Sequence, residues 1–206
     1  MSRKMHFKFG IVVFILVVAL FVQVFAVVDF GELSYYHSNS STIGTWTTTP
    51  TLYFTLYSPY ATTASSMESA TTIADSKWSG AGVPLVKSST STNIRVHTGE
   101  YDTIKALYPS FVNGVIGETV PTWTTYGTAT YNSATKTVKK ITSAKIYYVP
   151  KATYKDDFIV THEVGHAIGW VGHSAVYGEV MYSQAMSNTG SFVLSTNEKN
   201  HIGQIY

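Results

Sequence analysis

The sequence predicts a single domain of the α+β class from two periodicities and the chain length. Residues 51–57 (TLYFTLY) alternate apolar and hydroxyl side chains, which is the period of a half-buried strand. Residues 65–78 instead place apolar side chains three and four positions apart, the spacing of an amphipathic helix. The 206 residues suffice for one hydrophobic core and are few for two.

The first 26 residues place Arg3, Lys4 and Lys8 before a long apolar run. A basic head, an apolar stretch and a small residue at its end, here Ala26, are typical of a secretory signal peptide. We therefore expect residues 1–26 to be removed on export, which leaves a secreted, extracellular chain. The alternative is an uncleaved signal anchor with the chain facing outside, because residues 9–28 are long enough to span a bilayer.

Residues 27–50 are rich in Ser and Thr and show little periodicity, so we expect a linker or a loosely attached N-terminal arm. The folded domain is then expected to cover residues 51–206. A formal charge of +2 is too small to indicate nucleic acid as a partner. Because the chain has no cysteine, thiol catalysis and thiolate zinc ligands are excluded.

The rest of the domain is expected to consist of short strands and two further helices. Gly80 and Gly82 end the first helix. The strand candidates after it are residues 83–88, 92–98, 113–120, 122–132 and 141–149, the last stopped by Pro150.

A second helix is predicted over residues 155–169, with Asp156 or Asp157 as its N-cap. Gly169 stands where a helix usually ends in a left-handed residue. A third helix is predicted after Ser195, because Ser195 and Glu198 have the spacing of a capping box. Its apolar face carries Ile202 and Ile205.

The second predicted helix and the residues after it contain the segment THEVGHAIGWVGHS, residues 161–174. A helix advances about 100° per residue, so His162 and His166 project from one face, where both imidazoles can bind one metal ion. Glu163 can accept a proton from a metal-bound water without being a ligand. A catalytic zinc needs three protein ligands and an open position. Gly169 lets the chain turn back, and His173 is the candidate third ligand.

The motif HEVGHAIG, the following His173 and Ser174, and the segment VMYS at residues 180–183 resemble the metzincin zinc peptidases. Their signature is HExxHxxGxxH followed by a methionine turn. The residues after the third histidine are most similar to those of the matrixins, the matrix metalloproteinase-like branch. The resemblance implies a zincin-like domain with a twisted mixed sheet, an active-site helix and a C-terminal helix. It also implies that Met181 forms a hydrophobic floor beneath one zinc ion without binding it.

The resemblance further implies an exported zinc-dependent endopeptidase, a hydrolase that acts on protein or peptide substrates. Zinc held by neutral His162, His166 and His173 is expected to lower the pKa of its bound water towards about 7. Glu163 is expected to take the water's proton and to deliver it to the leaving amine. An edge strand near residues 115–119 is expected to hold the substrate peptide by strand addition. We expect the protein to be a monomer.

One interval departs from the signature. Trp170, Val171 and Gly172 stand between Gly169 and His173, where the family has two residues. We favour a loop that bulges by one residue at Gly172, because the distance from His173 to Met181 keeps the matrixin register. The alternative is a crippled metal site in a noncatalytic metzincin-like binding module.

The remaining histidines and motifs give weaker signals. His97 is a candidate for a second, structural zinc, but the His-Gly-Asp pattern of such sites is missing, so we expect an exposed strand residue. His6, His37 and His201 are isolated in the sequence and are expected to be solvated. No acidic loop has the spacing of a calcium-binding hand, so calcium has no support. Motifs of serine hydrolases and phosphate-binding loops are absent as well.

Overall fold

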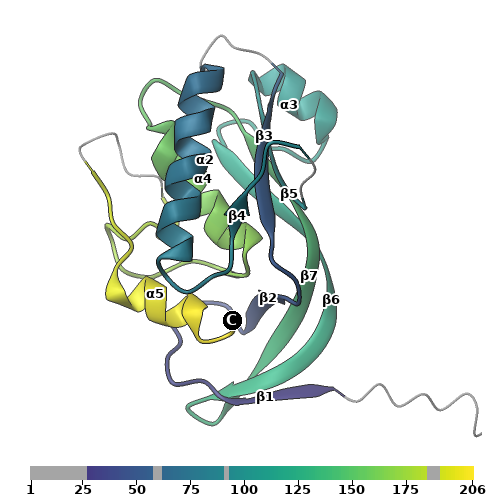
Figure 1. The fold of residues 1–206 in the computed structure, drawn as a ribbon, viewed down its shortest axis with the longest axis vertical. Coiled ribbons are helices and arrows are strands. Elements are labelled where there is room, and N and C mark those ends of the chain that lie inside the picture. The colour runs from purple at the N-terminus through teal and green to yellow at the C-terminus, as the bar shows by residue number, and fades with distance from the viewer. Residues whose placement is uncertain (1–26, 58–61, 91–92, 185–190) are drawn as a thin grey trace, which may run out of the picture.

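The computed structural model describes residues 27–57, 62–90, 93–184 and 191–206, and the expected export segment lies outside these ranges. The described residues form an α+β structure with a twisted, mostly parallel sheet of seven strands and four helices (Figure 1). The predicted class is therefore confirmed. Within the described ranges, no helix has the length and apolar character needed to cross a membrane.

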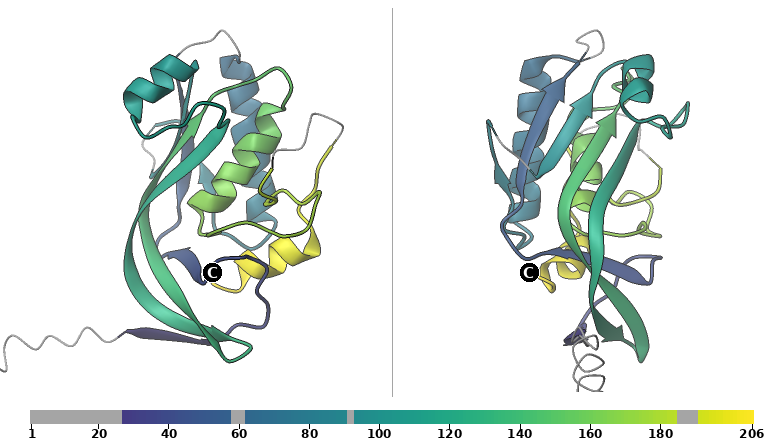
Figure 2. Two further views of the ribbon diagram at one scale, coloured as in Figure 1. Left: turned by 180° about the vertical axis from the view of Figure 1, so that it is seen from behind. Right: turned by 90° about the vertical axis from the view of Figure 1, so that its right-hand side faces the viewer.

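The sheet has the strand order β1-β6-β7-β5-β3-β4, and β2 pairs with β7 outside this path. All strand pairs are parallel except β6 and β7, which form one long antiparallel hairpin. This hairpin curves past the helices and carries β1 at its far end (Figure 2). The strands are β1 (Val28–Glu32), β2 (Thr42–Trp46), β3 (Thr51–Leu56), β4 (Val86–Lys87), β5 (Ile94–Thr98), β6 (Gly117–Tyr131) and β7 (Ala134–Tyr148).

Helices α2 (Ala64–Ser79) and α4 (Asp156–Ala167) pack against each other and against the sheet. The predicted apolar spacing of α2 is confirmed, since it buries Met67, Ala70, Ala74 and Trp78. The indole nitrogen of Trp78 also donates a hydrogen bond of 2.8 Å to the carbonyl oxygen of Thr161, which fixes α2 to α4. Helix α5 (Thr196–Gly203) has the predicted capping box of Ser195 and Glu198.

A second, smaller apolar cluster forms around α3 (Tyr101–Leu107), a short helix that the sequence did not predict. Ile104 of this helix packs with Phe111, Tyr147 and Val149. The cluster lies next to the start of β6, so it supports the strand that borders the cleft described below.

Residues 27–50 are not a loosely attached arm, and this expectation is corrected. Strand β1 pairs with β6, and β2 pairs with β7 from Thr42↔Thr137 to Trp46↔Ile141. Ile43 and Trp46 are buried, and the Trp46 indole donates a 3.0 Å hydrogen bond to the Ala167 carbonyl oxygen. The Ser- and Thr-rich composition of residues 27–50 did not reveal these strands, because parallel strand pairing is made by backbone groups and needs only a few apolar side chains.

Two further expectations are wrong in detail. Helix α4 has Lys155 at its N-cap, and the Asp156 carboxylate instead accepts hydrogen bonds from the hydroxyls of Tyr148 and Thr62, each 2.5 Å long. The strands predicted at residues 113–120 and 122–132 are one strand, β6, which runs through Pro121. Proline is tolerated there because β6 pairs only with β7 around that residue, so the missing N–H breaks no second ladder.

Candidate metal centre

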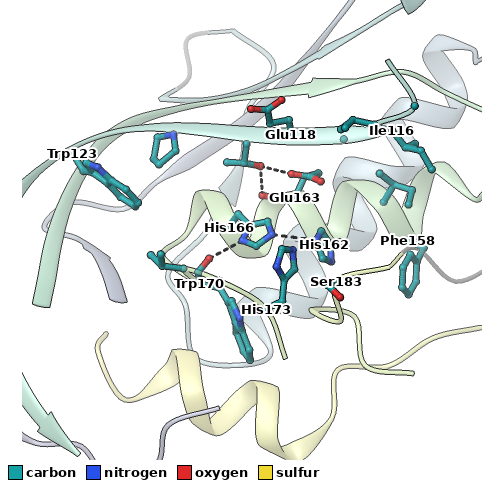
Figure 3. Close-up of a pocket in the computed structure, with 18 residues that line it drawn as sticks. Ile116, Glu118, Trp123, Phe158, His162, Glu163, His166, Trp170, His173 and Ser183 are labelled. Atoms are coloured by element: carbon teal, nitrogen blue, oxygen red, sulfur yellow. Dashed lines mark hydrogen bonds between the residues drawn. The ribbon is translucent and has the colours of Figure 1, made fainter. Parts of the chain in front are cut away.

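Three imidazoles converge at the cleft side of α4 (Figure 3). His162 and His166 project from α4 itself, and His173 comes from the loop that follows. One ligand nitrogen from each ring lies within 4.8 Å of the other two, and in the described ranges no other trio of His, Cys, Asp or Glu meets in this way. His173 therefore reaches the other two histidines despite the extra residue before it.

The hydrogen bonds of the two helical histidines fix which nitrogen is available to a metal. The Nδ1 of His162 lies 2.5 Å from the Val180 carbonyl oxygen, and the Nδ1 of His166 lies 2.7 Å from that of Trp170. A carbonyl oxygen can only accept, so each Nδ1 must carry the proton of the neutral ring. The Nε2 atoms are then bare acceptors, which is how metal-binding imidazoles are usually oriented.

The two bare Nε2 atoms face each other at 3.1 Å. Neither can donate to the other, so their lone pairs repel unless a cation or an added proton lies between them. Two nitrogens about 2.0–2.1 Å from a tetrahedral zinc are roughly 3.3 Å apart, close to the observed spacing. The donor set and its geometry therefore fit a zinc-sized ion.

The protonation states of the three rings agree with metal binding. Burial lowers the pKa of His162 and of His173, and it lowers the pKa of His166 well below its usual value. The neighbouring His162 lowers the pKa of the other two further. All three imidazoles are thus held neutral at pH 7, and only a neutral imidazole can bind a metal ion.

Met181 lies against the middle of α4. A Cβ atom at Gly165 would collide with the Met181 sulfur and would lie 2.7 Å from Cζ2 of Trp78, so only glycine leaves room for this contact. Met181 is buried, and its backbone N–H donates a 2.7 Å hydrogen bond to Oε1 of Glu198. The C-terminal helix therefore fixes the segment that carries Met181 through the same glutamate that forms its capping box.

Glu163 lies beside the three histidines, next to the edge of the sheet (Figure 3). Its Oε2 accepts a 2.6 Å hydrogen bond from the Thr119 hydroxyl. Burial raises the pKa of Glu163 to about 7; the Thr119 hydrogen bond opposes this rise and the charge of Glu118 adds to it. A carboxyl with a pKa near neutrality can both take up and release a proton.

Gly117 makes the position of Glu163 possible. A Cβ atom at residue 117 would lie 2.5 Å from Oε1 and 2.8 Å from Cγ of Glu163, both too close for real atoms. Gly117 and Thr119 lie within residues 115–119, which were expected to hold the substrate as an edge strand, but their contacts with Glu163 were not expected. No local pattern reveals a contact with a residue more than forty positions later.

The histidines and Glu163 line a cleft of about 530 Å³. It lies between the edge of the sheet and the loop after Gly169. From Gly117 to Tyr126, β6 pairs with β7 on one side, and no described strand pairs with its other side. The backbone groups on that side are available to an added strand. The residues of the cleft wall outside the metal centre include Ile116, Pro121, Trp123, Phe158 and Trp170.

The other histidines are less exposed than the sequence suggested, although His97 does lie in a strand, as expected. His97 is half-buried in β5 between the rings of Tyr57 and Tyr147, and burial, with the charges of Lys145 and Arg95, lowers its pKa to about 4. It belongs to no trio of possible metal ligands in the described part of the chain.

His37 and His201 are not solvated, so that expectation is wrong, and His6 lies outside the described residues. The Nε2 of His37 lies 2.6 Å from Oε2 of Glu179, within hydrogen-bond distance. His201 is buried, and its Nδ1 accepts a 3.1 Å hydrogen bond from the backbone N–H of His37. The helical spacing of His201 with Glu198 was a usable signal that both lie on the buried face of α5, whereas Ile205 is buried just after the helix ends at Gly203.

Comparison with known proteins adds no assignment. No protein-family model matches this chain, and no curated protein matches it significantly.

Proposed function

We propose that this chain is an exported zinc-dependent endopeptidase with a zincin-like domain of the metzincin type, similar to the matrixins. The observation that carries the proposal is the convergence of His162, His166 and His173 beside Glu163, in a cleft bordered by the edge of a sheet. A twisted mixed sheet with an active-site helix and a C-terminal helix is also the architecture that the resemblance implies.

The residues present can hold one zinc ion through the three imidazoles. Bound zinc supplies Lewis-acid chemistry, since it polarises a carbonyl group and acidifies a water molecule. The carbonyl oxygens of Val180 and Trp170 orient the rings of His162 and His166 for this role, and burial keeps the rings neutral. Met181 supports α4 at Gly165 and is not a ligand.

The chain's own residues then bind the substrate and move the proton. The unpaired side of β6 next to Gly117 holds a peptide in extended form, so that its scissile carbonyl faces the three histidines. The Glu163 carboxylate takes a proton from the attacking water, and the same carboxyl gives a proton to the leaving amine. The Thr119 hydroxyl keeps the carboxylate at the cleft wall throughout.

The alternative is a noncatalytic metzincin-like module that binds a partner without cutting it. In one form of this alternative, the extra residue before His173 prevents the third histidine from binding the metal. The position of His173 beside the other two histidines weighs against that form. A module with an intact metal site and no turnover remains distinguishable by experiment.

The test combines metal content with protein hydrolysis. We expect the purified protein to carry one zinc ion per chain and to cleave casein or gelatin, to lose cleavage with a chelator, and to regain it with added zinc. Glu163→Ala should keep the zinc and lose cleavage, because Glu163 moves the proton and does not bind the metal. His173→Ala should lose the zinc. The matched control, His97→Ala, should keep both. Zinc binding without hydrolysis of any protein substrate would favour the binding module.

A further inference from the structure

The extra residue before His173 is covered by a segment from the other end of the chain. Gly172 has a left-handed backbone, with φ of +78°. A Cβ atom on it would collide with Oδ1 of Asn39 and would lie 2.9 Å from Oγ of Ser38. Residues 38–40 therefore pack directly on the bulge, at the side where any other residue would place its side chain.

Asn39 holds both backbone polar groups of His173. Its own N–H donates a 3.1 Å hydrogen bond to the His173 carbonyl oxygen, and its side-chain Oδ1 accepts a 2.9 Å hydrogen bond from the His173 N–H. The hydroxyl of Ser38 donates to the carbonyl oxygen of Val171. The backbone is thus held on both sides of Gly172 by two adjacent residues.

The supporting segment is itself anchored. His37, next to Ser38, pairs with Glu179 at 2.6 Å. Further along, the N–H of Gly44 donates a 2.8 Å hydrogen bond to the carbonyl oxygen of Gly169, at the start of the loop. Gly44 belongs to β2, which is paired with β7 over five residues. The contact with His173 is therefore made by a fixed part of the sheet domain.

We propose that Asn39 is a positioning residue of the metal centre: through its paired hydrogen bonds to His173, it sets the lengthened loop so that this imidazole meets those of His162 and His166. The inference rests on the proposed function, because it assumes that these three histidines bind a metal ion. In this proposal, residues 38–40 support the loop before His173, and this support is how the chain accommodates the additional residue at position 172.

The experiment measures metal affinity without turnover, in the Glu163→Ala background. Zn²⁺ affinity is determined by competition with a chromophoric chelator, and the coordination of Co²⁺ by its visible absorption. Asn39→Ala removes one hydrogen bond to His173, so we expect roughly five- to tenfold weaker Zn²⁺ binding. We also expect a weaker Co²⁺ band, because His173 is bound for less of the time. Asn39→Asp keeps the acceptor oxygen and should bind Zn²⁺ at least as tightly as the parent.

The matched control is Asn200→Ala, which removes an exposed asparagine from α5. Circular dichroism checks that every variant is folded under the binding conditions. If Asn39→Ala, Asn200→Ala and the parent bind Zn²⁺ with equal affinity, the positioning role of Asn39 is refuted, while the metal centre itself is not. The positioning role is also refuted if Asn39→Ala and Asn39→Asp lose the same amount of Zn²⁺ affinity. If the unsubstituted protein binds neither Zn²⁺ nor Co²⁺, or if His173→Ala binds them as well as the parent, the proposed metal centre itself fails.

Discussion

Replacing Gly117 with alanine tests whether the position of Glu163 matters for catalysis. The backbone of Gly117 is not left-handed, so alanine fits the main chain and only the new methyl group matters. That methyl group would lie 2.5 Å from Oε1, 2.8 Å from Cγ and 2.9 Å from Cδ of Glu163. An ordinary contact of 3.4 Å or more requires the carboxylate to retreat by about 1 Å from the position in which it accepts the Thr119 hydrogen bond. A displacement of about 1 Å at a reacting group costs on the order of 100-fold in rate, or about 2.7 kcal/mol.

The assay is the kcat for a fluorogenic peptide, measured together with the zinc content. Gly117→Ala should lower kcat by about two orders of magnitude and keep the zinc, because the three atoms nearest to the new methyl group all belong to Glu163. Gly80→Ala is the matched control, since Gly80 ends α2 away from the cleft and has helical dihedral angles. A Gly117→Ala protein with unchanged kcat would refute the assigned place of Glu163. Loss of zinc would refute the separation of base and metal ligands.

Three further predictions concern the supports of the site. Deleting Gly172 restores the family spacing, but it should weaken zinc binding by about tenfold or more, because His173 loses its hydrogen bonds to Asn39. If the deletion instead creates proteolytic activity, the metal site of the unsubstituted protein is crippled. Gly165→Ala should lower the free energy of unfolding in urea by about 1–3 kcal/mol, because its methyl group overpacks against Met181, and an unchanged midpoint would contradict the contact. Burial lowers the pKa of His201 to about 3, whereas the pKa in the unfolded chain is about 6.5. The free energy of unfolding that this shift contributes is therefore complete above pH 6.5 and is lost as the pH falls towards 3. Denaturation at pH 7 and pH 5 should therefore show a smaller loss of stability for His201→Gln than for the unsubstituted protein, and identical losses would contradict the burial of a neutral ring.

The sequence predicted the elements whose signals are local. The apolar spacing of α2, the capping box of Ser195 and the left-handed Gly169 each depend on a few neighbouring residues, and the structure has all three. The convergence of His173 with His162 was also predicted, because the register to Met181 placed the extra residue before the ligand.

Features that depend on distant pairing could not be predicted in this way. Strand β2 is defined by its pairing with β7 about a hundred residues later, and its own residues carry no alternating pattern. Helix α3 has seven residues and no side-chain cap. The roles of Gly117 and Asn39 appear only when the edge strand meets Glu163 and when the N-terminal segment meets His173. In each of these contacts, the sequence around one residue does not indicate which distant residue it will meet.

The contact between Asn39 and His173, which joins positions 134 residues apart, has a consequence for the order of events during folding. The segment around Asn39 and the loop that carries His173 must both be in place before the third imidazole is correctly oriented, and such long loops are slow to close. A folding intermediate that lacks the β2 pairing would present only the two helical ligands. High-affinity uptake of the ion should thus report that folding is complete, and refolding followed by metal uptake should show this signal as the last kinetic phase.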